Sequence, residues 1–548
     1  MRAFASSFGA WRQLEENEDI KVPHGLVFPL AVVEAIGKPY GLSLTAEEHE
    51  PAGPLDYDAI FITVLDSRCM IEGGKFFKEW RVPLRRQDRS RESPLVWAGG
   101  QGLHNPLPLA DVFDLCVIGD AESPLPELLQ LWNRLGHDRV RFLSEAASIE
   151  AVFVPSVHDP TRDRLRQSVT DDITVTLKEH IQVSQNGQRR VEIARGCKYK
   201  CTFCSLGWRA PSRENTTQSI LQVLEDSPKI VHLQAGDAES HSGIKEIRAV
   251  LHAKGGRDNG WTGRLDTTLA NPDTVIPGSK RYAFGVEGVS HRLRAAVGKG
   301  YLSDERLTED TIRFLDNVEE EYYGRAAWHL IAGLPTERAD EVFHLHRVIR
   351  NIDEGMKHAK RRNLALHWQP FQPLPGTPMQ WFGCGRGVRE MAGTFKDLTG
   401  LHNLRVRQLT GRTNFMAAAT TILARATPQG GARVLEAMAH LPLPSLPALR
   451  EMAEAHEGPL DVSRPLPWGF IDYAYPENTL RKAYENTVRK LAEIPSDQWR
   501  AMPAESRMAW QQPKELPTPA VRDKKALDGY GLRLAALRAS RLRQGNNT

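Results

Sequence analysis

The chain has 548 residues, of which 41% are hydrophobic and 25% are charged, with 71 Lys and Arg against 68 Asp and Glu. This length allows several domains, and the near balance of charge excludes both a strongly basic polyanion binder and an acidic disordered chain. The first 20 residues lack the layout of a signal peptide, and no run approaches the roughly 20 apolar residues that cross a bilayer. We therefore expect a cytoplasmic protein (host cytoplasm if it is viral) with no membrane partner.

Residues 1–165 alternate short apolar runs with glycine turns and helical patterns. Short, continuously apolar runs are typical of parallel strands that are buried on both faces. We therefore predict an α/β fold that begins with a Rossmann-like, doubly wound domain, whose ligands bind at the carboxyl ends of the strands. The runs are Asp58–Leu65, Pro94–Ala98 and Phe113–Ile118, and the polar stretch His158–Asp172 is expected to be a linker.

Residues 166–385 contain five further strand-like runs, separated by helical patterns. Repeated βα units over about 200 residues predict a parallel barrel or part of one. Residues 386–548 are expected to form a mainly helical C-terminal region, with helices at Asn414–Leu441, Pro476–Ile494 and Pro519–Gln544. The strand-like runs of the barrel are Arg190–Ala194, Lys229–Leu233, Arg281–Phe284, Ala327–Ile331 and Leu364–Trp368.

Three of the six cysteines, Cys197, Cys201 and Cys204, fall within eight positions. In a reducing compartment such clustering indicates metal binding or catalysis rather than disulfides. A thioredoxin-like pair would use Cys201 and Cys204 and would leave Cys197 without a role. Soft thiolates favour an iron-sulfur cluster, and three of them hold three irons and leave the fourth open to a ligand.

A zinc site is the other metal alternative, and it needs a fourth ligand that this segment does not supply. His232, His241 or Cys384 would have to complete it. The basic residues around the cysteines favour the anionic cluster, because positive charge stabilises thiolates. They are Arg195, Lys198 and Lys200.

The segment Cys197–Cys204, which follows a predicted strand and has Phe203 before its last cysteine, resembles the signature of the radical S-adenosylmethionine (radical SAM) superfamily. The resemblance implies a partial (β/α)6 barrel and a four-iron, four-sulfur (4Fe-4S) cluster on Cys197, Cys201 and Cys204. It also implies SAM at the open iron, reductive cleavage of SAM to a 5′-deoxyadenosyl radical, and an electron donor of the flavodoxin or ferredoxin type.

The segment after the second predicted strand resembles the Gly-Gly-Glu element of this family, which receives the SAM amino group. The match is imperfect because Asp237 replaces a glycine. The resemblance implies that Gly236 and Glu239 contact SAM, and that Phe203 packs beside the cluster and the adenosyl group.

Three later segments resemble SAM-binding elements of the family in the family's order. The stretch with Glu287 and Ser290 resembles the one near the SAM ribose and carboxylate. The stretch with Gly333 and Pro335 resembles the Gly-Leu-Pro element beside adenine, and Gln372–Pro378 resembles its Pro-Gly-Thr-Pro turn. Such elements at the ends of successive strands agree with the position of active sites in parallel barrels.

The first region resembles the cobalamin-binding-type domain that precedes many radical SAM barrels. The resemblance rests on Leu95–Gly100, Phe113–Glu122 and Val152–Pro155. The Asp-x-His-x-x-Gly loop of histidine-ligated cobalamin proteins is absent, and the corresponding loop is Leu65–Met70. Cobalamin therefore stays an open alternative as a cofactor, and Cys116, inside an apolar run, is expected in the core.

The sequence says least about the substrate. Basic groups at His358–Arg362 and Arg522–Arg543 would suit phosphates, although a solvated helix face is the alternative. One hypothesis is a radical SAM enzyme that modifies or isomerises a nucleobase, free or in nucleic acid, as in phage-type DNA hypermodification. The others are a cobalamin-dependent C-methyltransferase of a small molecule or peptide, and a non-catalytic iron-sulfur or nucleic-acid-binding protein. No residue that reacts with the substrate is identifiable.

Overall fold

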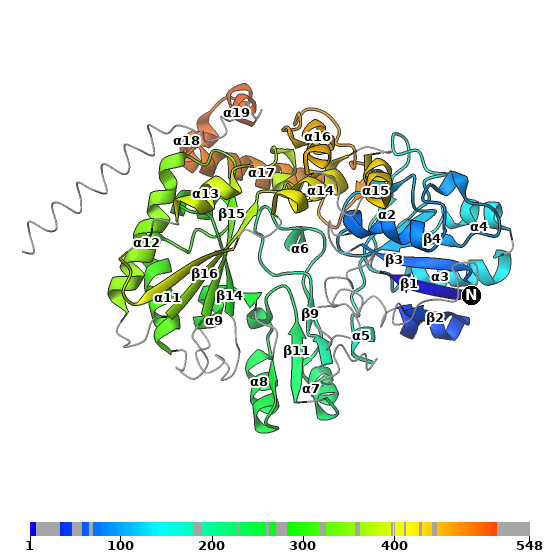
Figure 1. Cartoon of the computed structure of the whole chain (residues 1–548), viewed down its shortest axis with the longest axis horizontal. Helices are drawn as coiled ribbons and strands as arrows, with labels where there is room; N and C mark the ends of the chain where they lie inside the picture. Colours follow the sequence, from blue (N-terminus) through cyan, green and yellow to red (C-terminus); the bar gives the residue numbers. More distant parts are fainter. Residues whose placement is uncertain are drawn as a thin grey trace, which may run out of the picture.

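The N-terminal sheet lies at the right of Figure 1 and the five-stranded sheet of the central region at the left, and C-terminal helices bridge them in the upper part of the view. The computed structural model describes residues 1–6, 33–46, 57–64, 69–136, 138–178, 189–227, 229–258, 262–269, 282–317, 325–356, 362–395, 398, 400–409, 413–426, 430–440 and 446–511. No helix within these ranges is both long and apolar enough to cross a membrane.

The N-terminal sheet has the strand order β2-β1-β3-β4-β5-β6. All neighbouring strands pair in parallel except β5 and β6, which pair antiparallel. This arrangement confirms the predicted doubly wound architecture. The strands are β1 (Arg2–Ser6), β2 (Ser43–Ala46), β3 (Ala59–Thr63), β4 (Leu95–Gly99), β5 (Leu115–Val117) and β6 (Val152–Phe153).

Helices cover both faces of this sheet, because successive residues of each strand point to opposite sides. On one face, Phe61 and Trp97 pack against helices α3 (Pro124–Leu135) and α4 (Arg139–Ala146). On the other face, Ile60 and Val96 pack in one core with four helices, three of which come from the C-terminal region. These four are α2 (Cys69–Glu79), α14 (Thr413–Arg425), α15 (Gly430–His440) and α16 (Leu446–Glu457).

The central region forms two parallel sheets that together make the partial barrel. The three-stranded sheet has the order β12-β11-β8, and the five-stranded sheet runs in chain order from β13 to β17. The strands are β8 (Arg189–Glu192), β11 (Ile230–Gln234), β12 (Arg257–Asp258), β13 (Thr262–Gly263), β14 (Tyr282–Glu287), β15 (Arg325–Ala332), β16 (Arg362–Pro370) and β17 (Leu404–Leu409).

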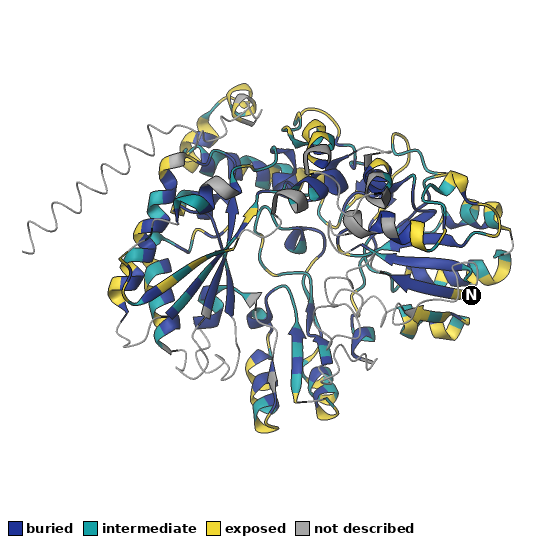
Figure 2. Ribbon diagram, in the orientation of Figure 1, coloured by how far each residue is buried: buried dark blue, intermediate teal, exposed yellow. Residues whose placement is uncertain are grey.

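The barrel sheet extends beyond residue 385, where we expected the helical region to begin. Strand β17 pairs with β16 in a continuous register from Arg362↔Leu404 to His367↔Leu409. The connecting helices lie outside the strands and bury their apolar stripes against them (Figure 2). They are α7 (Thr217–Glu225), α8 (Ile244–Ala253), α9 (Leu265–Leu269), α10 (His291–Ala296), α11 (Asp304–Asn317), α12 (Val342–Gly355) and α13 (Val388–Thr394).

Large aromatic side chains fill the barrel core. Trp328 and Trp368 lie on neighbouring strands and are buried, as is Trp381 in the turn after β16. Helix α17 (Glu477–Leu491) closes this core because Tyr484 packs against Trp381 and Phe382. Truncation of such a buried tryptophan to alanine typically costs about 3–5 kcal/mol, so this cluster is a principal source of barrel stability. Two short helices follow, α18 (Ser496–Ala501) and α19 (Ala504–Gln511).

The polar stretch that we expected to be a linker is part of the fold. Strand β7 (Leu165–Arg166) pairs in parallel with β18 (Ile471–Asp472) of the C-terminal region. Ser168 then forms a bridge with Gly119 after β5. This stretch therefore joins the N-terminal sheet to the C-terminal region before the chain continues through α5 (Val175–Lys178) into the barrel.

Candidate iron-sulfur site

The three clustered cysteines lie on one loop after β8. The two strands at its neck, β9 (Ala194–Arg195) and β10 (Arg213–Glu214), pair antiparallel and close the loop. Gly196 opens it with a φ of 81°, which a residue with a Cβ adopts only with strain. Cys204 ends it as the N-cap of the short helix α6 (Ser205–Trp208).

One hydrogen bond within the loop and two from other parts of the barrel fix this loop. The indole Nε1 of Trp208 donates to the carbonyl oxygen of Cys201 over 3.0 Å. The amide of Thr202 donates to the carbonyl oxygen of Val297 after α10 over 3.2 Å. The amide of Met379, directly after the Pro-Gly-Thr-Pro turn, donates to the carbonyl oxygen of Thr202 over 3.3 Å. Residues that follow two of the segments resembling SAM-binding elements therefore contact the cysteine loop.

Two glycines allow the backbone to approach the cysteines closely. A Cβ on Gly236 would lie 2.6 Å from the carbonyl oxygen of Gly196 and 3.1 Å from the Cβ of Cys197. A Cβ on Gly298 would lie 3.3 Å from the Cα of Cys201, at a φ of 91°. Gly236 thus lies directly beside the first cysteine of the loop.

The chemistry of the three thiols fits a metal cluster. Burial raises the pKa of Cys197 and Cys201, and it raises that of Cys204 to about 12. The positive charges of Lys299 and Arg264 act in the opposite direction on Cys197 and Cys201. Buried thiols lose their protons when a metal replaces them, so three free cysteines on one fixed loop suit thiolate ligation of iron.

The described residues do not supply the fourth ligand that a zinc site would need. The Nε2 of His241 lies 2.9 Å from the carbonyl oxygen of Asn215, and its Nδ1 accepts from the amide of Gly243. Cys384 contacts Thr421 instead, with its Sγ 3.4 Å from the hydroxyl. In the described part of the chain no three His, Cys, Asp or Glu side chains converge on a single ion. In a cluster each thiolate binds a different iron, so such convergence is not required.

The basic residues that we expected to balance the cluster charge are engaged elsewhere. Arg195 pairs with three carboxylates, those of Asp120, Glu122 and Glu192. The Nζ of Lys198 lies 2.6 Å from Oε1 of Glu214. Lys200 donates to the carbonyl oxygen of Gly207 and lies over the Tyr475 ring. The sequence interpretation was wrong here because adjacency along the chain does not fix the direction of a long side chain.

Arg264, directly after β13, is one of the two cations that act on Cys197 and Cys201. Its guanidinium lies between two rings, 3.8 Å from the centroid of Tyr199 in the cysteine loop and 4.1 Å from that of Tyr301. Asp266 holds it in a bidentate pair at 3.1 and 2.9 Å. Sequence reasoning missed Arg264, although its place at the carboxyl end of a barrel strand was an available signal.

Two acidic residues follow β11, and they occupy different environments. Glu239 is buried and pairs with Arg248 of α8. Asp237 lies next to Gly236, and its Oδ1 accepts from the backbone amide of Arg264 over 3.4 Å. Burial raises the pKa of Asp237 to about 6, and its charge in turn raises the pKa of Cys197. The structure thus places Asp237, rather than Glu239, beside the cysteine loop.

The two residues predicted after β14 have partners within the protein. Glu287 has a φ of 67°, unusual for a residue with a side chain, and its Oε1 accepts from Nζ of the buried Lys299 over 2.9 Å. The same Nζ donates to the carbonyl oxygen of Gly285 over 2.6 Å. Ser290 caps α10, and its hydroxyl donates to Glu341 over 2.7 Å.

The Gly-Leu-Pro segment forms a tight turn after β15. Gly333 has a φ of 73°, and its amide donates to Oε2 of Glu337 over 2.6 Å. Pro335 is buried within the turn. Burial raises the pKa of Glu337 to about 8, against the effect of this amide. Phe203 is half-buried and packs against the barrel core.

Fold and site together define a parallel α/β barrel protein with a three-cysteine loop suited to an iron-sulfur cluster. Residues 191–349 match the model of the radical SAM superfamily, and residues 33–155 match that of the N-terminal region of radical SAM proteins. The two matches cover just over half of the chain. The chain belongs to the radical SAM superfamily, whose cofactors are a 4Fe-4S cluster and SAM.

No curated protein matches the chain. Similar solved structures include the cobalamin-dependent SAM radical enzyme OxsB with aqua-cobalamin and SAM bound, at 13% identity and a TM-score of 0.44. This match covers 64% of the present chain and 52% of that one, so the chain spans about half of its length. OxsB with aqua-cobalamin alone matches at 12% identity and a TM-score of 0.42, over 93% and 71% of the two chains. SuiB of Streptococcus suis matches at 12% identity and a TM-score of 0.28, and the match covers 54% of the present chain and 67% of that one.

Proposed function

We propose that the protein is an enzyme that cleaves SAM reductively and uses the resulting radical on a substrate. The observation that supports this most directly is the cysteine loop, fixed by hydrogen bonds from α10 and from the turn after β16. With its cluster and SAM bound, such a site supplies a 5′-deoxyadenosyl radical. The protein contributes the position of the cofactors and the exclusion of water.

The residues of the loop and of the neighbouring strand ends have separate proposed roles. Cys197, Cys201 and Cys204 hold three irons. Asp237, beside Gly236, is the carboxylate that receives the SAM amino group, because Glu239 is already paired with Arg248. An electron donor of the flavodoxin or ferredoxin type reduces the cluster.

The remaining predicted contacts follow from their places after β14 and β15. Glu287, with the Lys299 ammonium on its Oε1, offers a charged pair for the SAM ribose and carboxylate. Ser290 fixes the start of α10 in this proposal. The Gly333 and Pro335 turn provides the backbone surface beside adenine.

Anaerobic reconstitution tests this function. We expect about four irons per chain and, with SAM and a reductant, 5′-deoxyadenosine. Cys201→Ala should lose both, whereas Cys384→Ala, which changes a cysteine outside the loop, should keep both. A Cys201→Ala protein that still forms the product, or a wild-type protein without iron, would contradict the proposal.

For the substrate we propose a nucleobase, free or in nucleic acid, which the enzyme modifies or isomerises. The support is the basic segments His358–Arg362 and Arg522–Arg543, which lie almost entirely outside the described residues. A mass change in nucleotides or DNA after incubation with the active protein is the test. Binding to phosphates should weaken steeply with salt, and salt-independent binding would argue against this substrate class.

A cobalamin-dependent C-methyltransferase is the alternative, and the doubly wound N-terminal sheet is the observation in its favour. The carboxyl ends of β4 and β5 are contacted by Arg209 and Arg195 of the chain itself, and the residues directly after β1 and β3 lie outside the described part of the chain. Corrinoid in the purified protein, or methyl transfer that depends on added cobalamin, would favour this alternative.

A further inference from the structure

The neck of the cysteine loop places two arginines opposite each other. Strands β9 and β10 form only two residue pairs, and Arg195 is the direct partner of Arg213. Like charges at directly opposite positions of an antiparallel pair are destabilising. An anion that contacts both guanidinium groups would offset this repulsion and help to keep so short a ladder closed.

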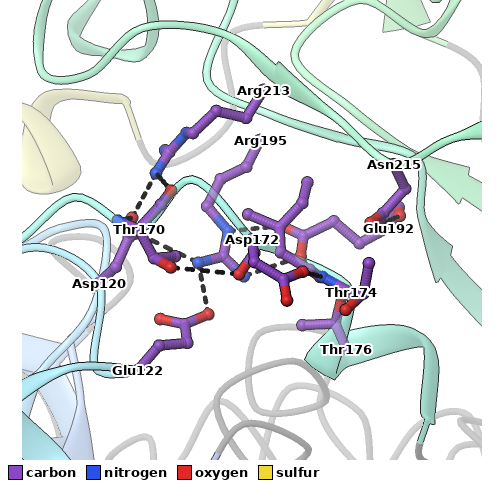
Figure 3. A network of polar contacts seen from close by, with 11 residues as sticks. Asp120, Glu122, Thr170, Asp172, Thr174, Thr176, Glu192, Arg195, Arg213 and Asn215 are labelled. Atoms are coloured by element: carbon purple, nitrogen blue, oxygen red, sulfur yellow. Dashed lines mark hydrogen bonds and ion pairs between the residues drawn. The ribbon is translucent and has the colours of Figure 1, made fainter.

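Asp120 of the N-terminal sheet supplies that anion (Figure 3). Its Oδ1 lies 3.2 Å from Nη1 of Arg195, and its Oδ2 accepts from Nη1 of Arg213. Glu122, in the same loop, accepts from Arg195 over 2.7 Å. On the barrel side, Glu192 holds Arg195 in a bidentate pair at 3.0 and 2.9 Å. The three carboxylates surround Arg195, but only Asp120 contacts both arginines.

The fold fixes the position of the Asp120 carboxylate. Asp120 follows β5, and its amide donates to the carbonyl oxygen of Ser168 over 3.0 Å. The preceding Gly119 has a φ of 102°, and a Cβ there would lie 2.1 Å from the same oxygen. Oδ2 of Asp120 also accepts from the amide of Thr170 over 2.9 Å. The carboxylate is therefore presented to the neck by backbone contacts rather than by a mobile side chain alone.

A second contact joins the other end of the loop to the N-terminal sheet. Arg209, directly after α6, is buried, and its Nη1 donates to the carbonyl oxygen of Gln101 over 2.8 Å. Gln101 follows β4, the strand next to β5. Arginines on both sides of the three cysteines thus reach the carboxyl ends of neighbouring N-terminal strands.

We propose that Asp120 is a positioning residue for the iron-sulfur loop: its carboxylate bridges the facing pair Arg195 and Arg213 and so keeps the neck of the loop closed. The N-terminal sheet then acts as a support for the cluster of the adjacent barrel. The inference rests on the proposed function only in that the loop carries a cluster. Asp120 has no role in the proposed SAM chemistry.

The test compares two aspartates at opposite ends of β5. Asp114 precedes the strand, is buried, and also pairs with two arginines, Arg89 and Arg139, at 2.7 Å each. Within the described part of the chain its partners are Arg89, Arg139 and the amide of Val96, none of them in the cysteine loop, so Asp114→Asn is the matched control for Asp120→Asn. The full-length reconstituted protein is used, and the readouts are the rate of iron loss to a chelator and the EPR spectrum of the reduced cluster.

We expect Asp120→Asn to release iron about tenfold faster than wild type, as is typical when a partner outside the ligand set is lost. Asp114→Asn should lower thermal stability but release iron at the wild-type rate below its unfolding temperature. The double variant Asp120→Asn/Arg213→Gln removes one of the facing charges and should release iron as slowly as wild type. It tests the proposal even if Asp120→Asn alone does not fold.

Wild-type iron release and an unchanged EPR spectrum in Asp120→Asn would overturn the proposal, as would equal acceleration in Asp114→Asn. Failure of the double variant to restore slow release would overturn it too. A wild-type protein that binds no cluster would instead contradict the proposed function, so the two failures are distinguishable.

Discussion

The barrel and the N-terminal sheet of this protein use the carboxyl ends of their strands in different ways. In the barrel, the carboxyl ends of the strands carry the cysteine loop and glycine turns that let backbone segments approach one another closely. In the N-terminal sheet, the ends of β4 and β5 contact arginines that flank that loop. A strand-end loop is therefore a binding surface or a support, depending on what the rest of the chain places against it.

The largest expected effect is that of Gly236→Ala, which compares the strand ends of the barrel with those of the N-terminal sheet. In Gly236→Ala the new Cβ meets the backbone oxygen of Gly196 and the Cβ of Cys197, so the cysteine loop must shift. We expect severalfold lower iron content after reconstitution, with near-normal secondary structure by circular dichroism. Gly99→Ala, at the end of β4, meets nothing closer than 3.7 Å and serves as the control. Equal iron content in both variants would show that the approach at Gly236 is unimportant.

The next largest effect is expected at Gly119, which follows β5 in the N-terminal sheet. Gly119→Ala combines a positive φ with a backbone clash at Ser168, so we expect a loss of more than about 2 kcal/mol in the free energy of unfolding. Gly387→Ala has a φ of 84° but open space around its Cβ, so it isolates the cost of the backbone strain. Denaturant titration measures both. If the two variants lose the same stability, the contact between Gly119 and Ser168 contributes nothing.

A smaller effect is expected from Arg264, and it tests how a charge at the end of a barrel strand acts on the cysteine loop. Arg264→Gln removes a positive charge that acts on Cys197 and Cys201. A reduced cluster carries more negative charge than an oxidised one, so its reduction potential should fall, on the order of tens of millivolts. Arg264→Lys keeps the charge but loses the stacking between the two tyrosines. A redox titration that found the same potential in wild type and Arg264→Gln would remove Arg264 from the electrostatics of the cluster.

The last effect is a pH dependence of the free energy of unfolding that comes from Glu337 in the turn after β15. Burial raises its pKa in the folded state from 4.5 to about 8, so the folded protein binds a proton there that the unfolded chain releases. Its contribution to stability is complete below pH 4.5 and is lost as the pH rises toward 8. Glu337→Gln should flatten this part of the stability profile and be more stable than wild type near pH 8. Parallel profiles of the two proteins between pH 5 and 8 would contradict the assignment.

The sequence predicted the parts of the fold that local patterns encode. Apolar runs such as Pro94–Ala98 became strands, and the spacing of Cys197, Cys201 and Cys204 indicated one metal-binding loop. It missed the pairing of β7 with β18, since two-residue strands carry no periodic signal. It also missed Arg264 and the direction of Arg195, because both depend on contacts between segments far apart in the chain.

The packing of α14, α15 and α16 on the N-terminal sheet also orders events during synthesis. One face of that sheet is complete only when residues such as Ile422 and Leu435 have been made, more than three hundred positions after Val96. At about 5–20 residues per second, the ribosome needs tens of seconds to reach them. During this interval α2 is the one helix of the four on this face that has been made, so part of this apolar face stays uncovered and the domain should depend on chaperones until the last helices dock.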